Sequence, residues 1–414
     1  MTRDVTPNCG KCGLCLAVCP VYAVLKEELV SPRAKLQLIK AVEDKNLLSS
    51  PRIKSLVSKC LMCGRCSALC PSGINHYAKF MDMRRIMVKD HGEAVSIKSL
   101  IYLLSREYRL SMAAGMGCLG QAVIPKRFKE IFHLGNINLE KFPEFNRKPF
   151  RSQVPDVIAP TGHEKGTVIY FTGCATNYLY EDTGMSVLSI LNHMGYRVLI
   201  PKHQTCCAIP MLFHGAVEKA ADSVKTNIRA LTRTGLENVD AVIVDCLTCG
   251  TALKQEWGHL CDDLGLDRAG ANEISAKVQD IVSFILARFD DIELKFRGDD
   301  DPVRVTYHPP CHLKNPPGTP TPLEKLLGRI PHIDYVKAPG TDDCCGGGGT
   351  FFYEYPEISR KMIEKKIGNL RTAKAGFCLT DCPVCRINLS GNLPATDSPG
   401  VIHPAGIIAR FLKR

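Results

Sequence analysis

The sequence has no long hydrophobic run, one tryptophan in 414 residues and no apolar segment before its first cysteine, at position 9. A membrane-spanning helix needs about 20 apolar residues and a signal peptide needs an apolar stretch near its start, so we expect neither. No Gly-x-Gly-x-x-Gly motif follows a strand pattern, and no paired carboxylates or Ser-His-Asp set stand out. We therefore expect a cytoplasmic protein with reduced thiols and no flavin or nicotinamide site in this chain.

Positive charge is in excess, and the formal net charge is +11. The basic residues are not interleaved with aromatic ones as on nucleic-acid-binding surfaces, so we expect no nucleic acid partner. The expected partner is an anionic membrane surface or an acidic protein subunit.

Cysteine is abundant, with 21 copies. Two runs, CGKCGLCLAVCP at 9–20 and CLMCGRCSALCP at 60–71, both have the spacing C-x2-C-x2-C-x3-C-P. In bacterial ferredoxins three cysteines of such a run bind one 4Fe-4S cluster and the fourth binds the neighbouring cluster. The spacing favours two cubane clusters over zinc, because zinc sites usually combine two separated C-x2-C pairs. We predict one cluster on Cys9, Cys12, Cys15 and Cys70, and a second on Cys60, Cys63, Cys66 and Cys19.

The segment between these runs predicts a helix. Ser31 followed by Pro32 is typical of a helix start, and Leu36, Leu38, Ile39 and Val42 fall near helical spacing. A compact ferredoxin would leave far fewer residues between its motifs. We therefore expect an α-helical ferredoxin domain with two clusters over residues 1–92.

The rest of the chain contains an internal duplication. Five cysteines recur with offsets of 136 to 138 residues, and each set combines a single cysteine, an adjacent pair and a C-x2-C motif. The sets are Cys174, Cys206, Cys207, Cys246 and Cys249, and then Cys311, Cys344, Cys345, Cys382 and Cys385. Strand-like runs lead into these cysteines and helical segments lie between them, so each repeat predicts an α/β unit with a parallel sheet.

Adjacent cysteines and glycines mark the second repeat, DCCGGGGTFF at 342–351. Neighbouring Cα atoms lie about 3.8 Å apart and an unstrained disulfide needs about 5.5 Å, so Cys344 and Cys345 cannot readily bridge each other. Glycine allows positive φ and a close backbone approach. We expect a loop folded against a ligand that both thiols contact.

The duplicated C-x31–39-CC-x35–38-C-x2-C pattern behind two ferredoxin runs resembles the CCG proteins. These include the iron–sulfur subunits of glycolate oxidase and D-lactate dehydrogenase, the C subunit of anaerobic glycerol-3-phosphate dehydrogenase, and the B or D subunits of heterodisulfide reductase. The resemblance covers essentially the whole chain. It implies one or two 4Fe-4S clusters in the CCG repeats, of the cubane or the non-cubane type, and an FAD-binding partner subunit.

Some details depart from that family or distinguish its members. Ala208 follows the first cysteine pair where a glycine is common, so that loop is expected to lie less closely on its cluster. The segment SPRAKLQLI at 31–39 resembles the glycolate and lactate group, whereas the complete set of ten CCG cysteines differs from the usual glycolate oxidase pattern.

Three cysteines and two histidines remain. Cys378 aligns with Val242 and is expected on a buried strand, and Cys118 and Cys261 have no partner at a metal spacing, so we interpret all three as structural. His308 and His312 flank Cys311. Each either contacts a cluster or caps a strand end.

The predicted fold is α+β and multidomain. The ferredoxin domain is followed by a connector at 93–165, a first CCG domain at 166–300 and a second at 301–414. The connector is basic, and its apolar residues Ile97, Leu100, Ile101, Leu104 and Tyr108 repeat at helical spacing. This face either packs on the protein's own domains or contacts a partner or membrane, so a peripheral position on the inner face of the cell membrane stays open.

The predicted function is electron transfer. Electrons from the flavin of a partner that oxidises glycolate or D-lactate would pass through the ferredoxin clusters and CCG clusters toward quinone or another acceptor. The alternative is a heterodisulfide reductase-like protein that cleaves a disulfide at a CCG cluster. No catalytic residue is assigned from the sequence.

Overall fold

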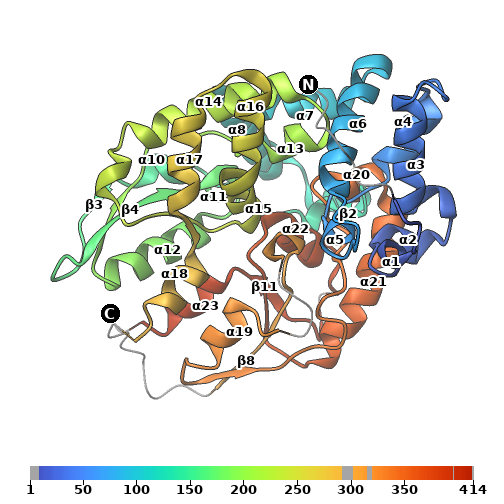
Figure 1. Ribbon diagram of the computed structural model, residues 1–414. Helices are drawn as coiled ribbons and strands as arrows, with labels where there is room; N and C mark the ends of the chain where they lie inside the picture. The colour runs from blue at the N-terminus through green and yellow to red at the C-terminus, as the bar shows by residue number, and fades with distance from the viewer. Residues whose placement is uncertain (1–8, 291–301, 315–318, 395, 413–414) are drawn as a thin grey trace.

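The computed structural model describes residues 9–290, 302–314, 319–394 and 396–412. The N-terminal part is helical, and its described residues contain no strand before position 133. Its helices are α1 (Leu14–Ala17), α2 (Pro20–Leu25), α3 (Pro32–Glu43), α4 (Pro51–Ser58), α5 (Arg65–Ala68) and α6 (His76–His91). These helices lie together on one side of the molecule, in blue in Figure 1.

The helix predicted after Ser31 is confirmed as α3. The Ser31 side chain accepts a hydrogen bond from the backbone N–H of Ala34, and Pro32 is the first helical residue. Leu36 and Ile39 are buried in the core that α3 shares with α4 and α6. The apolar spacing of the helix therefore positions it beside the cysteine runs.

The connector continues from these helices. It contains α7 (Val95–Leu104), α8 (Glu107–Val123), α9 (Lys126–Ile131), β1 (His133–Leu134), β2 (Ile137–Asn138), α10 (Phe150–Gln153) and β3 (Val157–Ile158). Ile97, Ile101 and Leu104 are buried and Leu100 packs against the same core, whereas Tyr108 is exposed, so most of the apolar face that stood out in the sequence packs on the protein itself. Across the described residues, no helix combines the length and apolar character needed to cross a membrane.

The first repeat forms the sheet β3-β5-β4-β6-β7, in which β4, β5, β6 and β7 are parallel and β3 is antiparallel. Its strands are β4 (Gly166–Phe171), β5 (Tyr196–Leu199), β6 (Ala241–Val244) and β7 (Val278–Asp280). Its helices are α11 (Gly173–Tyr178), α12 (Glu181–His193), α13 (Ile209–Phe213), α14 (Val217–Thr232), α15 (Leu247–Thr251), α16 (Trp257–Leu264), α17 (Arg268–Lys277) and α18 (Ile281–Ala287).

The second repeat forms the parallel sheet β11-β10-β8-β9, which has the same strand order as the parallel part of the first. Its strands are β8 (Val303–Tyr307), β9 (Ile333–Tyr335), β10 (Phe377–Leu379) and β11 (Gly400–Ile402). Its helices are α19 (Pro322–Leu327), α20 (Phe351–Glu354), α21 (Pro356–Thr372), α22 (Pro383–Asn392) and α23 (Pro404–Arg410). The duplication and the parallel sheets predicted from the sequence are thereby confirmed. The predicted boundary at 300/301 lies outside the described residues.

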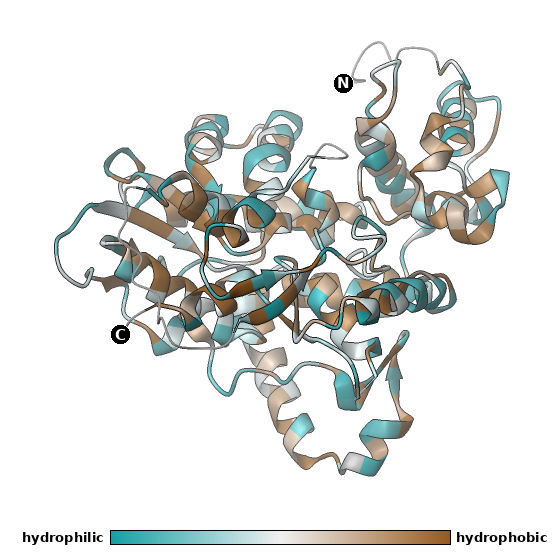
Figure 2. Cartoon of the chain, turned by 90° about the horizontal axis from the view of Figure 1, so that it is seen from below, coloured by the Kyte–Doolittle hydropathy of each residue, from teal (hydrophilic) through white to brown (hydrophobic). Residues whose placement is uncertain are grey.

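The two repeats pack against each other through equivalent helices. Helix α12 contacts α23 of the second repeat, and its counterpart α19 contacts α18 of the first. Hydrophobic side chains of both repeats share one core, and Figure 2 shows apolar strands between more mixed helices. This exchange of equivalent contacts indicates an approximate two-fold relation between the repeats. It brings the carboxyl ends of both parallel sheets toward the middle of the molecule, where the cysteines lie.

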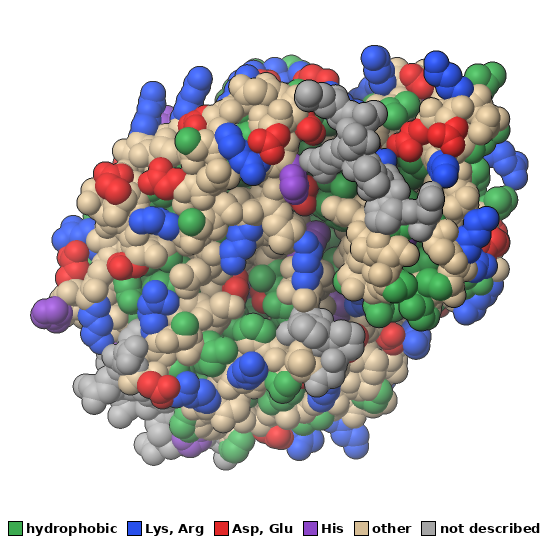
Figure 3. Space-filling model, viewed as in Figure 1, with side chains coloured by type: hydrophobic (Ala, Val, Ile, Leu, Met, Phe, Trp, Pro, Cys, Tyr) green, Lys and Arg blue, Asp and Glu red, His purple; other side chains and the backbone are tan. Residues whose placement is uncertain are grey.

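The surface visible in Figure 3 carries many Lys and Arg side chains with Asp and Glu between them. The excess of positive charge is therefore not gathered in a single basic patch on this face.

Candidate metal sites

The two ferredoxin runs repeat each other in backbone geometry. Lys11 and Met62, which precede the second cysteine of each run, both have φ of 53°. Gly13 and Gly64 follow that cysteine with φ of 86° and 72°, and each caps a short helix that carries the third cysteine. Glycine adopts this positive φ without the steric strain that a Cβ atom would add. Each run thus folds three cysteines around a loop in the same way.

Four cysteines of the predicted second cluster line one small cavity of ≈20 Å³. They are Cys19 from the start of α2 and Cys60, Cys63 and Cys66 from the second run. Burial, with an added contribution from the Cys60 thiol, raises the pKa of Cys63 to about 11. A metal ion or cluster would remove this penalty by holding the sulfurs as thiolates, so the residues suit the predicted group.

The other predicted ferredoxin set lies next to the first. Cys9, Cys12 and Cys15 surround the start of α1, and Cys70 follows α5, which α1 contacts. A Cβ built on Gly10 would lie 4.0 Å from Ser72 Oγ, so the loop of the first run lies against the turn after Cys70. Cys12 is exposed, which places this set nearer the surface than the second.

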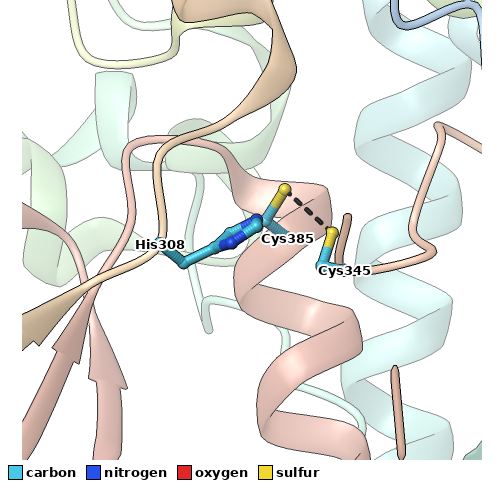
Figure 4. Close-up of side chains that lie close together, drawn as sticks. All are labelled: His308, Cys345 and Cys385. Atoms are coloured by element: carbon cyan, nitrogen blue, oxygen red, sulfur yellow. Dashed lines mark hydrogen bonds between the residues drawn. The ribbon is translucent and has the colours of Figure 1, made fainter. Parts of the chain in front are cut away.

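All five cysteines of the second repeat line a single cavity of ≈100 Å³. They are Cys311, Cys344, Cys345, Cys382 and Cys385. Cys345 Sγ and Cys385 Sγ lie 3.1 Å apart, and a ring nitrogen of His308 lies within 4.8 Å of both (Figure 4). His308 is therefore beside the thiols, whereas the sequence left its role open. Five thiols around one cavity exceed the four that a cubane uses, and this donor set suits an iron–sulfur group.

The glycines after the cysteine pair permit two close approaches. The N–H of Gly346 points to Cys344 Sγ at 3.3 Å, and Gly346 has φ of 77°. A Cβ on Gly348 would lie 2.4 Å from Leu61 Cδ2, next to Cys60 of the ferredoxin run. The glycines therefore let the CCG loop fold over its own thiols and against the loop of the second ferredoxin run.

The first repeat brings its five cysteines together as well. Interaction with the Cys206 thiol, together with burial, raises the pKa of Cys174, while Cys206 and Cys249 lower the pKa of Cys207 to about 6. The thiols thus form a chain of neighbours that ends at Cys246. A Cβ on Gly173 would lie 3.1 Å from Cys249 Sγ, so glycine is needed where α11 meets this set.

Ala208 stands where the second repeat has Gly346. It has φ of 80°, close to the 77° of Gly346 in the second repeat. The loop therefore keeps the glycine conformation with an alanine, at a cost of about 1 kcal/mol in backbone strain. The expectation that this loop lies less closely on its cluster stays a prediction.

Polar contacts connect the two CCG sites. Thr248, between Cys246 and Cys249, lies 2.9 Å from His312 Nδ1, and its hydroxyl is 3.8 Å from Cys382 Sγ. The N–H of Leu247 donates to the carbonyl of Asp381 at 3.1 Å. His312, whose role the sequence left open, therefore connects the two repeats.

In each repeat a strand tyrosine donates a hydrogen bond to a buried aspartate that directly precedes the C-x2-C motif. Tyr170 donates to Asp245 at 2.5 Å, and Tyr307 donates to Asp381 at 3.1 Å. Burial raises the pKa of Asp245 to about 6 and that of Asp381 to about 7. The sequence analysis missed both pairs, although their offsets of 137 and 136 residues match those of the cysteines.

The sequence analysis also missed two basic side chains, Lys35 and Arg65, that lie beside the cysteine thiols. Lys35 is 1% exposed, and its Nζ donates to the carbonyl of Lys59 at 2.5 Å. Burial lowers the pKa of Lys35, and the thiols of Cys60 and Cys19 oppose this. Arg65 donates to the carbonyl of Asp342 in the CCG loop and interacts with the thiols of Cys344, Cys63 and Cys311. A single lysine on an otherwise amphipathic helix gives no sequence signal of burial.

Three cysteines belong to none of these sets, although Cys378 lies in the same buried core as Cys345, Cys382 and Cys385. Cys378 is fully buried on β10, as is its counterpart Val242 on β6, so this prediction is confirmed. Cys261 is buried in α16 and Cys118 is partly buried in α8.

A helical domain with two ferredoxin-type cysteine runs, followed by two α/β repeats that each gather five thiols, defines an iron–sulfur protein. Comparison with protein families gives a cysteine-rich (CCG) domain at 168–254 and 305–390 and a 4Fe-4S dicluster domain at 6–74. Lactate utilization protein A of Oceanobacillus iheyensis is 31% identical over 55% of this chain and 89% of that protein. The chain belongs to the family of CCG-domain iron–sulfur oxidoreductase subunits.

Two other relatives match nearly the whole chain. The glycolate oxidase iron–sulfur subunit of Escherichia coli is 26% identical over 92% of this chain and 89% of its own length. The B subunit of the fumarate reductase (CoM/CoB) of Methanothermobacter marburgensis is 28% identical over 93% of this chain and 68% of its own length.

Proposed function

We propose that this chain is the electron-transfer subunit of a flavin-linked dehydrogenase that oxidises a 2-hydroxy acid, glycolate or D-lactate. The relatives named as glycolate oxidase iron–sulfur subunit and lactate utilization protein A support this substrate class. The flavin and the substrate would lie on a partner subunit, and electrons would leave this chain toward quinone or another acceptor.

One observation carries the proposal. Cys60, Leu61 and Arg65 line both the cavity of the second ferredoxin set and the cavity of the second CCG set. The two groups of thiols are therefore neighbours with one layer of side chains between them. Iron–sulfur clusters, when bound, supply one-electron storage at each site. The chain's own contribution is to hold these sites close together, in the order first ferredoxin set, second ferredoxin set, second CCG set.

The proposal includes the ligands predicted from the sequence. Eight cysteines would hold two cubane clusters in the two ferredoxin sets already described, and the ten CCG cysteines would hold one or two clusters, of the cubane or the non-cubane type. The division into domains at 1–92, 93–165, 166–300 and 301–414 is part of the same proposal. The pairing of Cys19 with the second run is supported by the shared cavity.

Anaerobic iron and sulfide analysis with EPR tests the assignment. We expect about 12 to 16 iron atoms per chain. Cys66→Ala should remove the signal of one ferredoxin cluster, whereas Cys118→Ala should leave iron content unchanged. Reduction of the clusters by a co-purified FAD-containing partner with glycolate or D-lactate would support the function. A cluster-loaded protein that no such flavoprotein reduces would contradict it.

A second candidate is cleavage of a disulfide at the second CCG site, the heterodisulfide reductase-like alternative that the sequence left open. The observation in its favour is the cavity beside Cys345 and Cys385, which Lys54, Arg84 and His214 also line. Thiol release from a disulfide by the dithionite-reduced holoprotein, without any partner, would favour this candidate over simple electron transfer.

A further inference from the structure

A large open cleft of ≈890 Å³ lies where the start of α8 meets the first CCG domain. Its walls come from α8, α10 and the loop before Cys206. They include Glu107, Tyr108, Ser111, Ser152, Lys202 and Thr205. None of the predicted metal ligands lines this cleft, so it is separate from the cavity of the second CCG set.

The inner wall of the cleft lies against the first CCG site. Thr205 is 3% exposed and directly precedes Cys206, and its Oγ1 makes no hydrogen bond with the described residues. Glu107 Oε1 accepts from Arg151 and, at 2.6 Å, from the Tyr178 hydroxyl, whereas the buried Oε2 makes no hydrogen bond within the described part of the chain. Two of the residues that line the cleft, Thr205 and Glu107, therefore each carry a buried oxygen without a hydrogen bond in the described part of the chain.

Arg151 connects this wall of the cleft to the loops of the first CCG site. It is 4% exposed and donates to the carbonyl of Gln204 at 2.9 Å and to that of Gly173 at 3.4 Å. Gly173 directly precedes Cys174. A molecule in the cleft would thus lie one layer of residues from the first CCG site.

The outer rim of the cleft continues into an exposed apolar stripe, which we define as Tyr108, Met112, Met116, Leu119 and Val123 of α8. These residues are three or four positions apart and so lie on one face of the helix. Met116 is 73% exposed, Leu119 68% and Val123 78%. Ile124, Phe128, Ile131 and Phe132 extend the exposed apolar surface along α9.

Positive charge accompanies this stripe. Residues 95–132 contain six Lys or Arg and two Glu, and no charged residue lies between Arg109 and position 126. Arg109 stacks on Tyr102 at 3.7 Å, which places its charge at the start of α8. An apolar face with basic residues at both ends matches an anionic bilayer, where apolar side chains enter the interface and the cations meet lipid headgroups.

We propose that the stripe of α8 docks on an anionic membrane and that the cleft beside it receives the headgroup of a membrane-borne quinone. This inference rests on the proposed electron-transfer function and names its acceptor site. A cluster held by the first CCG cysteines would supply two electrons, one at a time, and water in the open cleft would supply two protons, so that the quinone would become a quinol. Tyr108 belongs to both surfaces, so the quinone reaches the cleft directly from the bilayer.

Binding of decylubiquinone to the cluster-loaded protein tests the cleft. Ser152→Trp and Ser111→Trp would fill the cleft with a large side chain and should each weaken binding about tenfold or more in equilibrium dialysis. Ser96→Trp, at an exposed position of α7 outside the cleft, is the matched control and should bind as the wild type does. The proposal would be overturned if the wild-type protein did not bind the quinone, or if the two cleft variants bound it as tightly as the wild type does.

Vesicle flotation tests the stripe. The holoprotein should float with phosphatidylglycerol-containing vesicles at low salt and much less with pure phosphatidylcholine or at high salt. Met116→Glu with Leu119→Glu should abolish flotation and keep decylubiquinone binding in detergent. Leu48→Glu with Met185→Glu, two exposed apolar positions elsewhere, should float normally. Equal flotation of both double variants, or none by the wild type, would refute the membrane contact.

Failure here is distinguishable from failure of the proposed function. Reduction of the clusters by the flavoprotein partner is followed by EPR without quinone or lipid. If that reduction occurs while quinone binding and flotation are absent, electron transfer stands and only the acceptor site is wrong.

Discussion

The hydroxyl of Thr248 lies 2.9 Å from Nδ1 of His312 and joins the two CCG sites across the interface of the repeats. Each residue is next to the ligands of its own set, since Thr248 lies between Cys246 and Cys249 and His312 follows Cys311. The contact therefore connects the loops that carry the two CCG cysteine sets.

Thr248→Val keeps the shape of the side chain and removes the hydroxyl. We expect a loss of about 1 kcal/mol in the free energy of unfolding, because one partly buried hydrogen bond disappears. The EPR signal of the second CCG site should also change, since Thr248 Oγ1 lies 3.8 Å from Cys382 Sγ. Anaerobic urea unfolding and EPR check both effects. Thr232→Val, whose hydroxyl bonds only within its own helix, should leave the EPR spectrum unaltered.

The sequence predicted the parts of this architecture that depend on local patterns. Cysteine spacing identified the ferredoxin runs and the duplication, and strand-like runs before the cysteines predicted the parallel sheets. It could not predict which faces meet. The sequence left open whether the apolar face of Ile97, Ile101 and Leu104 packs inside the protein, and these residues are buried. The exposed apolar stripe lies instead on α8, where the sequence analysis singled out only Tyr108.

Tertiary contacts also decided what sequence patterns left open. The pattern of α3 is typical of a solvent-facing lysine at position 35, but two cysteine loops and Phe80 cover Lys35. The role of His308 depended on where β8 ends relative to Cys345 and Cys385, which are 37 and 77 residues further along the chain. Such long-range placement has no local signal in one sequence.

Ala208→Gly should stabilise the protein by about 1 kcal/mol, because Ala208 has a left-handed conformation that glycine adopts without strain. Gly346→Ala should destabilise it by more than that amount. The new Cβ would lie 2.9 Å from both the carbonyl oxygen and the hydroxyl of Ser359. Thermal unfolding under anaerobic conditions measures both changes.

Ala230→Gly is the control for Ala208→Gly, because it should change the stability in the opposite direction. Ala230 lies in α14, where glycine costs about 1 kcal/mol relative to alanine, so this variant should be less stable than the wild type. A lower midpoint for Ala208→Gly as well would show that the strain argument is wrong.

Lys35→Met should make the second ferredoxin cluster harder to reduce. Lys35 places a positive charge near Cys60 and Cys19, and reduction adds a negative charge at the site they surround. Removing the cation should shift the midpoint potential of that cluster to a more negative value, while methionine keeps much of the packing against Phe80. An EPR-monitored redox titration checks the shift. Lys40→Met, an exposed position on the same helix, should change the potential much less.

His403 should make the stability depend on pH. Its Nδ1 accepts from the N–H of Ala405 at 3.0 Å and its Nε2 lies 2.7 Å from the carbonyl oxygen of Asp245, an arrangement that requires the neutral ring. Burial lowers the pKa of His403 to about 4, and the nearby Arg386 cation acts in the same direction while Asp182 opposes it. The folded protein therefore resists protonation of this ring over a range in which the unfolded chain accepts the proton.

The unfolded histidine has a pKa of about 6.5, so the neutral ring's contribution is fully present above that pH and is lost as the pH falls from about 6.5 toward 4. Between about pH 7.5 and 5.5 this single group should lower the free energy of unfolding by about 1 kcal/mol. His403→Gln retains an acceptor for the Ala405 N–H and should remove this part of the pH dependence, whereas His163→Gln at an exposed position should retain it. Urea unfolding of the three proteins at both pH values measures the difference, and an equal pH dependence in wild type and His403→Gln would show that His403 is not the titrating group.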